Sequence, residues 1–250
     1  MSTGTAIQLW LVADGEPDGR DLERRLGVLS AEEVQRYRRI SAPGAARRFA
    51  VARWLARTAL SHNAEIGASE WRFAAGRHGR LEVAGPRPAE RLRFNLSHTP
   101  GLVACVVCRD LDCGVDCEDA GRPVDVGALA RRLPPGEAKA LEAAPGEERT
   151  HLFLSLWTLK EAFAKARGDG VPVALRGVAF SIDGASIRCT ITAGLHDDPS
   201  QWQFALLRPT PRHLVGLAVR SGASRRLPIV TRQAGPAGFD LVAMRPAASS

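Results

Sequence analysis

Two acidic residues separated by a single position form the first group in this chain that could do chemistry. Asp116 and Glu118 lie in the segment GVDCE. Side chains alternate along a strand, so both carboxylates would share one face and Val115 and Cys117 the other. Two carboxylates this close repel each other unless a cation or water separates them, and oxygen ligands of this kind suit a hard divalent metal. The alternative is a solvated outer strand face.

A second group follows in a long helical segment. Trp157, Glu161 and Lys165 are spaced four residues apart, which places them on one face of a helix. An exposed ion pair between Glu161 and Lys165 is one interpretation. The tryptophan on the same face favours a face turned toward protein or a cleft. There Glu161 would join Asp116 and Glu118 as a third oxygen ligand for Mg2+, with Lys165 close to a phosphate.

A polar segment at residues 95–101 holds Ser97 and His98 and is predicted to form a tight turn. Adjacent side chains usually diverge and no third orienting group is identifiable, so a hydrolytic dyad is not indicated. A structural turn and an anion contact both stay open, the latter with the hydroxyl and imidazole near Arg80. Arg36, Arg48 and Arg77 are further candidates for phosphate contact, although single arginines are most often solvated.

The elements that must position these groups follow from periodicity and turn signals. We expect strands at residues 5–13, 71–74, 81–83, 92–96, 102–108, 114–118, 178–182, 186–192, 201–207 and 213–219. We expect helices at residues 21–29, 30–40, 45–61, 123–133, 136–144 and 149–167. Ser30 followed by Glu33 predicts a capping box on the second helix. A long helix with aromatic residues precedes short strands twice, which hints at two similar α+β halves.

Composition limits the class of protein and of partner. The chain has 250 residues, 45% of them hydrophobic and 24% charged, as in soluble globular proteins. No apolar run reaches membrane-spanning length and no signal peptide is evident, so a cytoplasmic protein is expected. A net charge of +7 and a pI of 9.8 favour an acidic partner, which could be nucleic acid, a phosphate-rich ligand or an acidic protein.

Four of the five cysteines crowd into residues 105–117. Their spacing allows a zinc or iron–sulfur site. Cys105 and Cys108, however, lie in an apolar run at an odd separation, which places them on opposite faces of a strand. We therefore expect buried core cysteines, and a cysteine-ligated metal protein is the less favoured alternative.

Three motifs in order carry a family resemblance: NLSH at 95–98, GVDCE at 114–118 and WTLKEAFAK at 157–165. Together they resemble the 4'-phosphopantetheinyl transferases of the larger, monomeric type that activates peptide and polyketide synthetases. The resemblance covers most of residues 7–220. It implies a pseudo-twofold α+β fold of two similar halves, with coenzyme A bound between them. The expected domains are residues 1–112 and 113–222, followed by a tail at 223–250 whose composition suggests loose attachment.

The resemblance also implies an activity and partners. The 4'-phosphopantetheine arm would pass from coenzyme A to a serine of an acidic apo acyl or peptidyl carrier protein, with Mg2+ or Mn2+, releasing 3',5'-ADP. Neither nucleic acid nor membrane would be a partner. A basic nucleic-acid-binding protein is the alternative that charge alone suggests, although no reading motif is recognisable.

Roles for individual residues follow from the same resemblance. Asp116, Glu118 and Glu161 match the metal-binding acids, and Asp116, Glu161 and Lys165 the catalytic group. Ser97 and His98 match contacts to the 3'-phosphate of coenzyme A, and Lys165 matches the lysine near its pyrophosphate. Arg80 stands after Gly79 where lysine is common, while Arg48 and, less closely, Arg36 match basic positions on the coenzyme A side.

Overall fold

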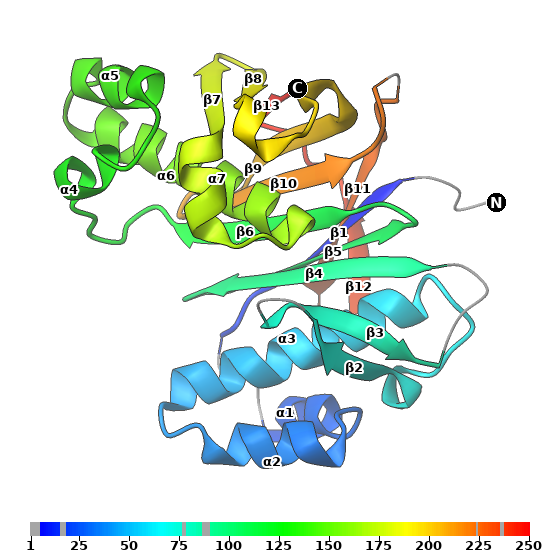
Figure 1. Cartoon of the computed structure of the whole chain (residues 1–250). Coiled ribbons are helices and arrows are strands. Elements are labelled where there is room, and N and C mark those ends of the chain that lie inside the picture. Colours follow the sequence, from blue (N-terminus) through cyan, green and yellow to red (C-terminus); the bar gives the residue numbers. More distant parts are fainter. Residues whose placement is uncertain (1–5, 16–18, 77–78, 87–90, 224, 236–237) are drawn as a thin grey trace. The chain divides into compact units, whose positions relative to one another are not determined.

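The computed structural model describes residues 6–15, 19–76, 79–86, 91–223, 225–235 and 238–250. The chain forms two compact units (Figure 1). Unit 1 comprises residues 1–111 and 228–243, and unit 2 comprises residues 112–227 and 244–250. Each unit combines helices with a largely antiparallel sheet, which confirms the predicted α+β class. The twofold relation between the halves stays a prediction.

Unit 1 is built on a five-stranded sheet in the order β12-β11-β1-β5-β4, with a separate hairpin of β2 and β3. The strands are β1 (Ile7–Val12), β2 (Arg72–Ala75), β3 (Leu81–Gly85), β4 (Leu92–Thr99), β5 (Leu102–Arg109), β11 (Ile229–Gly235) and β12 (Gly238–Val242). β1 lies in the middle of the sheet, antiparallel to β5 and parallel to β11. All its residues are buried, because it has a neighbour on both edges and apolar side chains on both faces.

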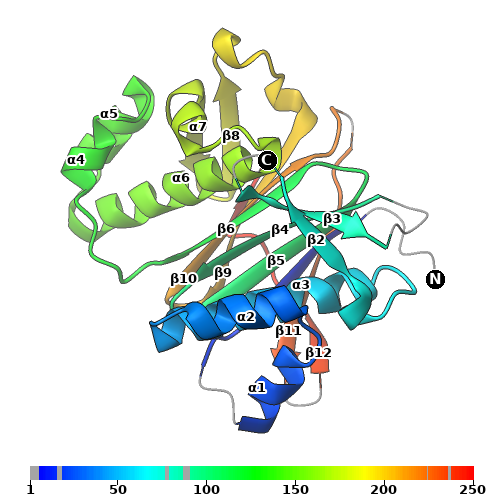
Figure 2. The same cartoon turned by 60° about the horizontal axis from the view of Figure 1, so that its bottom comes forward.

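Three helices belong to unit 1: α1 (Gly19–Leu26), α2 (Ala31–Arg39) and α3 (Pro43–Ser61). α3 packs on β1, β4 and β5, and α2 lies beside α3 (Figure 2). The predicted capping box at Ser30 and Glu33 is present at the start of α2. The fully buried Arg57 of α3 donates to Glu33 and to the carbonyl of Trp71, so one guanidinium ties three segments together.

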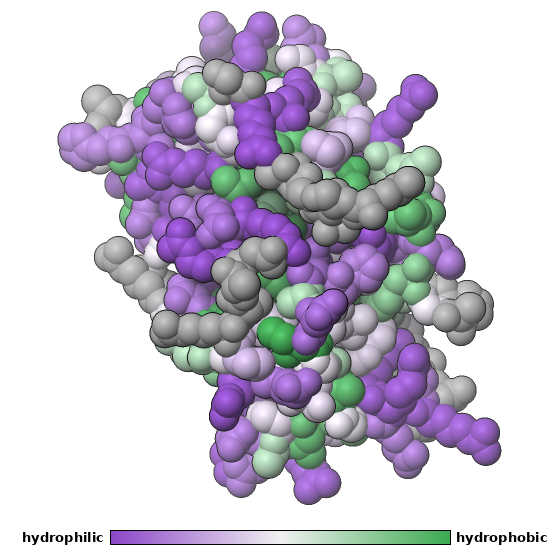
Figure 3. Space-filling model, turned by 90° about the vertical axis from the view of Figure 1, so that its right-hand side faces the viewer, coloured by the Kyte–Doolittle hydropathy of each residue, from purple (hydrophilic) through white to green (hydrophobic). Residues whose placement is uncertain are grey.

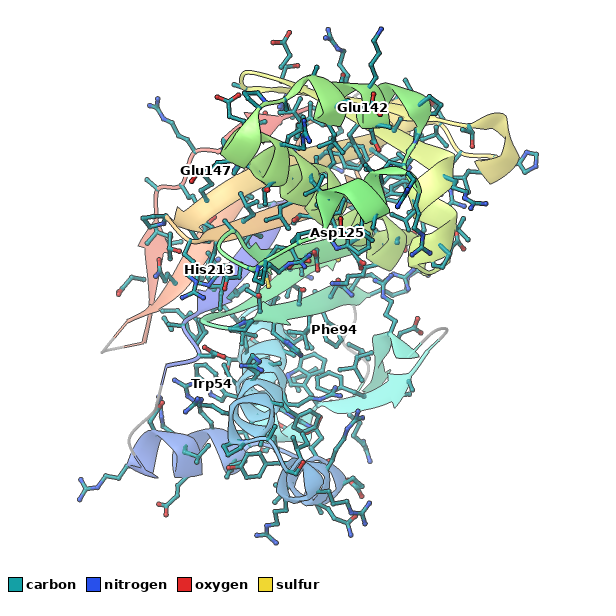
Figure 4. All side chains as sticks on the ribbon, turned by 90° about the vertical axis from the view of Figure 1, so that its left-hand side faces the viewer. Trp54, Phe94, Asp125, Glu142, Glu147 and His213 are labelled. Atoms are coloured by element: carbon teal, nitrogen blue, oxygen red, sulfur yellow. The ribbon has the colours of Figure 1, made fainter. Side chains whose placement is uncertain are left out.

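The core of unit 1 lies between α3 and the sheet. Trp54 on α3 and Phe94 on β4, both labelled in Figure 4, belong to one buried apolar cluster. Phe239 of β12 stacks on Trp54 and meets Trp10 of β1 edge-on. α3 is rich in alanine at its buried positions, and these small side chains let the helix pack closely on the sheet.

Unit 2 is built on a six-stranded sheet in the order β6-β10-β9-β13-β8-β7. The strands are β6 (Cys113–Asp119), β7 (Val178–Asp183), β8 (Ser186–Ile191), β9 (Trp202–Thr210), β10 (His213–Arg220) and β13 (Ala248–Ser249). The helices are α4 (Val126–Ala130), α5 (Pro135–Ala143), α6 (Gly146–Arg167) and α7 (Val171–Gly177). α6 packs along β6 and β10, and its buried side makes the core with Phe163, Phe180 and Phe204.

Local caps set the ends of these elements. Asp125, labelled in Figure 4, caps α4 by accepting the Ala128 amide at 3.0 Å. Gly168 ends α6 at a φ of +76°, in the left-handed conformation that glycine adopts most readily. His213, also labelled, begins β10, where its Nδ1 lies 2.7 Å from the Thr210 hydroxyl.

Three sequence predictions need correction. The polar segment at 95–101 is mostly strand, because β4 continues to Thr99 in register with β5, and only Pro100 and Gly101 make the turn. α7 was not expected, since VPVALRG holds a proline and glycine. The tail is not loosely attached at β11 and β12, because Ile229, Val230 and Thr231 are β-branched residues that pair directly with β1.

No helix in the described part of the chain combines the length and apolarity needed to cross a membrane. On the face shown in Figure 3, hydrophilic side chains predominate and hydrophobic ones form small, separate patches.

The four clustered cysteines, 105, 108, 113 and 117, are buried in β5 and β6, as expected of core residues.

Candidate active site

Asp116 and Glu118 lie on β6, and the strand places them on the same face, as predicted. β6 is an edge strand of the unit 2 sheet and pairs antiparallel with β10, where Asp116 is opposite Gly216. The Asp116 side chain is buried and that of Glu118 is half-buried. A solvated outer face would expose both carboxylates, so that alternative does not describe this pair.

Two glycines let α6 come into backbone contact with the strands that hold these acids. A Cβ atom on Gly114 would lie 2.0 Å from the Ala162 carbonyl oxygen, and one on Gly216 would lie 2.9 Å from that of Thr158. Any other residue at position 114 would push the helix away. The close approach brings Glu161 and Lys165 of α6 to the acids of β6.

Lys165 pairs with the strand rather than with its own helix. Its Nζ atom lies 2.6 Å from Oδ1 of Asp116. Glu118 is paired as well, because Arg122 donates to its two oxygens at 2.8 and 3.2 Å. Among the described residues no cation makes a salt bridge with Glu161, which leaves it the acid least compensated by direct contact.

Burial and the neighbouring charges shift the pKa values of these groups. Burial, and next the carboxylate of Asp116, raises the pKa of Glu161 to about 7; Glu118 adds to the effect and Lys165 opposes it. Burial and Asp116 also raise the pKa of Glu118, against the opposing charge of Arg122. Burial works to lower the pKa of Lys165, but Asp116 outweighs it, so that pKa lies above its ordinary value.

The donor set fits a hard divalent cation in its chemistry, since the charge of Asp116 raises the pKa of both Glu118 and Glu161 and a cation would relieve that repulsion. In the described part of the chain, however, no three His, Cys, Asp or Glu side chains are grouped as a metal centre. Two of the three acids have a cationic partner instead: Lys165 lies against Asp116 and Arg122 against Glu118.

Two further residues of the WTLKEAFAK segment have structural roles. Trp157 stacks on Phe153 at 5.9 Å between ring centroids and packs on the unit 2 core, as expected for a face turned toward protein. Lys160 is fully buried and pairs with the buried Glu137 of α5 at 2.9 Å. The neighbouring lysines therefore differ: Lys165 faces the acids of β6, whereas Lys160 joins α5 to α6.

The remaining predicted residues all lie in unit 1, and one of them, Arg77, lies outside the residues that the structure describes. Ser97 and His98 are neighbours on β4, the first buried and the second exposed. Arg36 lies over the ring of Phe49 at 5.3 Å, which joins α2 to α3. Arg80 directly precedes β3, and its carbonyl accepts the amide of Gly76. Gly79, with a φ of +76°, forms the turn before it.

Arg48 is joined to the hairpin that contains Ser97 and His98 by a residue that sequence reasoning missed. Asp14 accepts from Arg48 Nη1 at 3.3 Å through one oxygen and from the Gly101 amide at 2.7 Å through the other. Arg122 was missed too. An acid directly after a buried strand, and an arginine four residues after Glu118, are the only signals that the sequence offered for them.

Comparison with known proteins identifies relatives. A family model described as the 4'-phosphopantetheinyl transferase superfamily matches residues 112–218, which lie in unit 2. The 4'-phosphopantetheinyl transferase HetI of Nostoc sp. is 32% identical over 66% of this chain and 70% of its own length. The 4'-phosphopantetheinyl transferase Sfp of Bacillus subtilis is 27% identical over 70% of each chain, and AcpT of Escherichia coli 28% over 78% and 93%.

Proposed function

This chain belongs to the 4'-phosphopantetheinyl transferase superfamily, and from that premise we propose that it transfers the arm from coenzyme A to a serine of an apo acyl or peptidyl carrier protein. The observation that carries the proposal is the contact between Lys165 of α6 and Asp116 of β6, beside Glu118 and Glu161. All four residues fall within the segment that matches the family model.

The reaction is a phosphoryl transfer. The serine oxygen forms a bond to the β-phosphorus of coenzyme A, the bond from that phosphorus to the bridging oxygen breaks, and 3',5'-ADP leaves with the electron pair. Little covalent chemistry falls to the protein in such a reaction, so alignment and charge dominate the barrier. A buried carboxylate and two half-buried ones beside an ammonium group can provide such alignment and charge.

In this proposal Glu161 accepts the proton of the serine hydroxyl. Without a metal ion the pKa of this carboxyl is about 7, so it holds a proton more readily than an exposed glutamate does. Lys165 would turn from Asp116 to the negative charge that develops on the leaving phosphate. The positive charge of this ammonium is secure at neutral pH, because its pKa lies above the ordinary value.

Asp116, Glu118 and Glu161 are the residues that would hold Mg2+ or Mn2+. A bound ion would supply positive charge to the pyrophosphate. Ser97, His98 and the arginines Arg36, Arg48 and Arg80 would bind the phosphates of coenzyme A. An acidic carrier protein would be attracted by the net charge of +7, which speeds encounter.

Intact-mass spectrometry of an apo peptidyl carrier protein tests the proposal, after incubation with coenzyme A and Mg2+. We expect a mass gain of one phosphopantetheine, which EDTA abolishes. Glu161→Ala should slow the transfer by at least about a hundredfold, the usual contribution of a positioned base. Glu148→Ala is the matched control, since Glu148 is exposed on the same helix. Full activity of Glu161→Ala with Mg2+ would contradict the assigned roles.

A further inference from the structure

Asp14 follows β1 in unit 1 and is buried, with 6% of its surface exposed. A buried carboxylate is costly unless its oxygens are hydrogen-bonded or paired. Both oxygens of Asp14 have partners, and the two partners come from different elements: the guanidinium of Arg48 on α3 and the amide of Gly101 between β4 and β5. The side chain thus joins three segments that are far apart in sequence.

The contact with Gly101 matches the form of the turn. Thr99 and Leu102 are paired across the hairpin, so Pro100 and Gly101 are its two central residues. Proline followed by a glycine at a φ of +93° is typical of a type II turn, in which the amide of the second central residue points away from the hairpin. Asp14 accepts that amide at 2.7 Å, and its own amide donates to the Gly101 carbonyl at 3.4 Å.

The second partner of the Asp14 carboxylate is the guanidinium of Arg48. Arg48 lies in the first turns of α3, with 23% of its side chain exposed, and Nη1 is 3.3 Å from Oδ2 of Asp14. Only one guanidinium nitrogen makes this contact. A guanidinium has five N–H donors, so most of its donor capacity stays available to an anion. Asp14 therefore limits where the Arg48 group lies without consuming it.

We propose that Asp14 is a positioning residue for phosphate recognition: it sets Arg48 against the hairpin that contains Ser97 and His98. This inference rests on the proposed function, in which Ser97 and His98 contact the 3'-phosphate of coenzyme A. Asp14 does not itself touch the ligand, because a carboxylate would repel a phosphate. Its contribution is geometric, and it must outweigh its own unfavourable charge.

That opposition of effects makes a sharp test possible. Affinities for coenzyme A and for dephospho-coenzyme A, which lacks the 3'-phosphate, are measured by calorimetry without carrier protein. We expect Asp14→Asn to reduce the preference for coenzyme A over dephospho-coenzyme A by about tenfold, the size expected for one misplaced charge-assisted hydrogen bond. Asparagine keeps an acceptor oxygen for the Gly101 amide, so the turn should survive.

The matched control is Asp110→Asn. Asp110 also follows a strand of the same sheet and pairs with an arginine, Arg91, at 2.8 Å. This pair is exposed, and Asp110 lies after the last residue of β5, whereas Gly101 lies before its first. Its loss removes the same charge and should leave the preference unchanged. A general loss of stability in Asp14→Asn would weaken both ligands equally and leave their ratio intact.

A double-mutant cycle adds a second readout. If Asp14 acts through Arg48, Asp14→Asn should have little further effect on the ratio in an Arg48→Gln background. An unchanged or increased preference in Asp14→Asn would overturn the inference in favour of simple electrostatics. Coenzyme A binding by the wild type without discrimination would overturn it too, while leaving phosphopantetheine transfer intact. Failure of the wild type to bind coenzyme A would instead refute the proposed function along with it.

Discussion

Glu161 differs from the other acids of the candidate site in how its charge is balanced. Asp116 contacts Lys165, and Glu118 contacts Arg122 through both oxygens. Glu161 faces the negative charge of both acids in a half-buried position, and its pKa rises to about 7. Burial, and next the negative charge of Asp116, therefore disfavour the ionised form of Glu161.

The raised pKa predicts how metal-free stability depends on pH. Glu161 has a higher pKa in the folded state than its ordinary 4.5, so its stabilising contribution is present below about pH 4.5 and is lost as the pH rises through about 7. Glu161→Gln removes this loss. In EDTA, the free energy of unfolding of the variant should rise relative to that of the wild type by about 2 kcal/mol between pH 5 and pH 8. This figure already includes a discount for the partial solvent exposure of Glu161.

Urea unfolding at pH 5, 6.5 and 8 measures the effect. Glu148→Gln, at an exposed position of the same helix, should follow the wild type at every pH. Parallel stability profiles for wild type and Glu161→Gln would show that the carboxyl has an ordinary pKa. In that case the combined effect of burial and neighbouring carboxylates on Glu161 would be refuted.

At this scale the sequence predicts residue types and faces better than partners. Alternation along a strand and four-residue spacing along a helix were enough to put Asp116 with Glu118 and Glu161 with Lys165. Periodicity describes one element at a time, so it could not reveal that Lys165 crosses to Asp116. It could not reveal Asp14 either, because that contact joins residues 87 positions apart.

The packing of α6 on β6 and β10 is the element-level feature that assembles the site. At Gly114 and Gly216, backbone atoms of α6 occupy the space that a side chain would need. Gly114 is two residues before Asp116, and the carbonyl it faces belongs to Ala162, next to Glu161. The distance between strand and helix is therefore set at the position where the acids and Lys165 must meet.

Gly114→Ala tests this arrangement. The added methyl group would overlap the Ala162 carbonyl and the Ala166 amide, both of them backbone atoms that cannot rotate away. We expect a loss of about 2–3 kcal/mol in the free energy of unfolding, the upper range for overpacking. Carrier modification should fall as well, because Lys165 would be moved away from Asp116.

Gly136→Ala in α5 is the matched control, since a Cβ there meets nothing within 4 Å. At such an open helical position alanine should stabilise by about 0.4–1 kcal/mol. Urea unfolding and the mass-spectrometric transfer assay give both readouts. Equal behaviour of the two variants would mean that the close approach at Gly114 has no role in shaping the site.

Elements with strong periodicity were predictable, and those whose form depends on pairing were not. The helices at 45–61 and 149–167 correspond to α3 and α6. β4 extends further than its sequence suggests, because the polar residues Ser97 and Thr99 alternate with exposed His98 in register with an apolar partner strand. The composition of the tail also predicts coil, and β11 becomes a strand through its pairing with β1.

On the scale of the whole molecule, both compact units use segments that are far apart in the sequence. The chain passes from unit 1 to unit 2 after Leu111, returns at Pro228 and passes back after Ala243. β11 supplies the parallel neighbour of β1, and β12 brings Phe239 to 4.8 Å from Trp10. The middle strand of unit 1 thus depends on residues near the other end of the sequence.

Removal of residues 228–250 should therefore damage unit 1 as well as unit 2. Without β11 and β12, β1 becomes an edge strand with Trp10 uncovered, so we expect amide exchange in residues 7–12 to accelerate by about a hundredfold or more. Removal of residues 244–250 alone is the control, because it keeps both strands. Unchanged protection of β1 in the shorter chain would show that β11 contributes little to unit 1.

The pairing of β1 with β11 has a consequence for synthesis on the ribosome. Val12 and Ile229 are separated by 216 residues that must be translated before these strands can pair. At about 5–20 residues per second, the wait is roughly 10–40 seconds. During that time β1 lacks one of its two neighbouring strands, while residues 112–227 emerge from the ribosome. Until β11 is made, one edge of β1 stays unpaired, although β5 can already pair with the other edge.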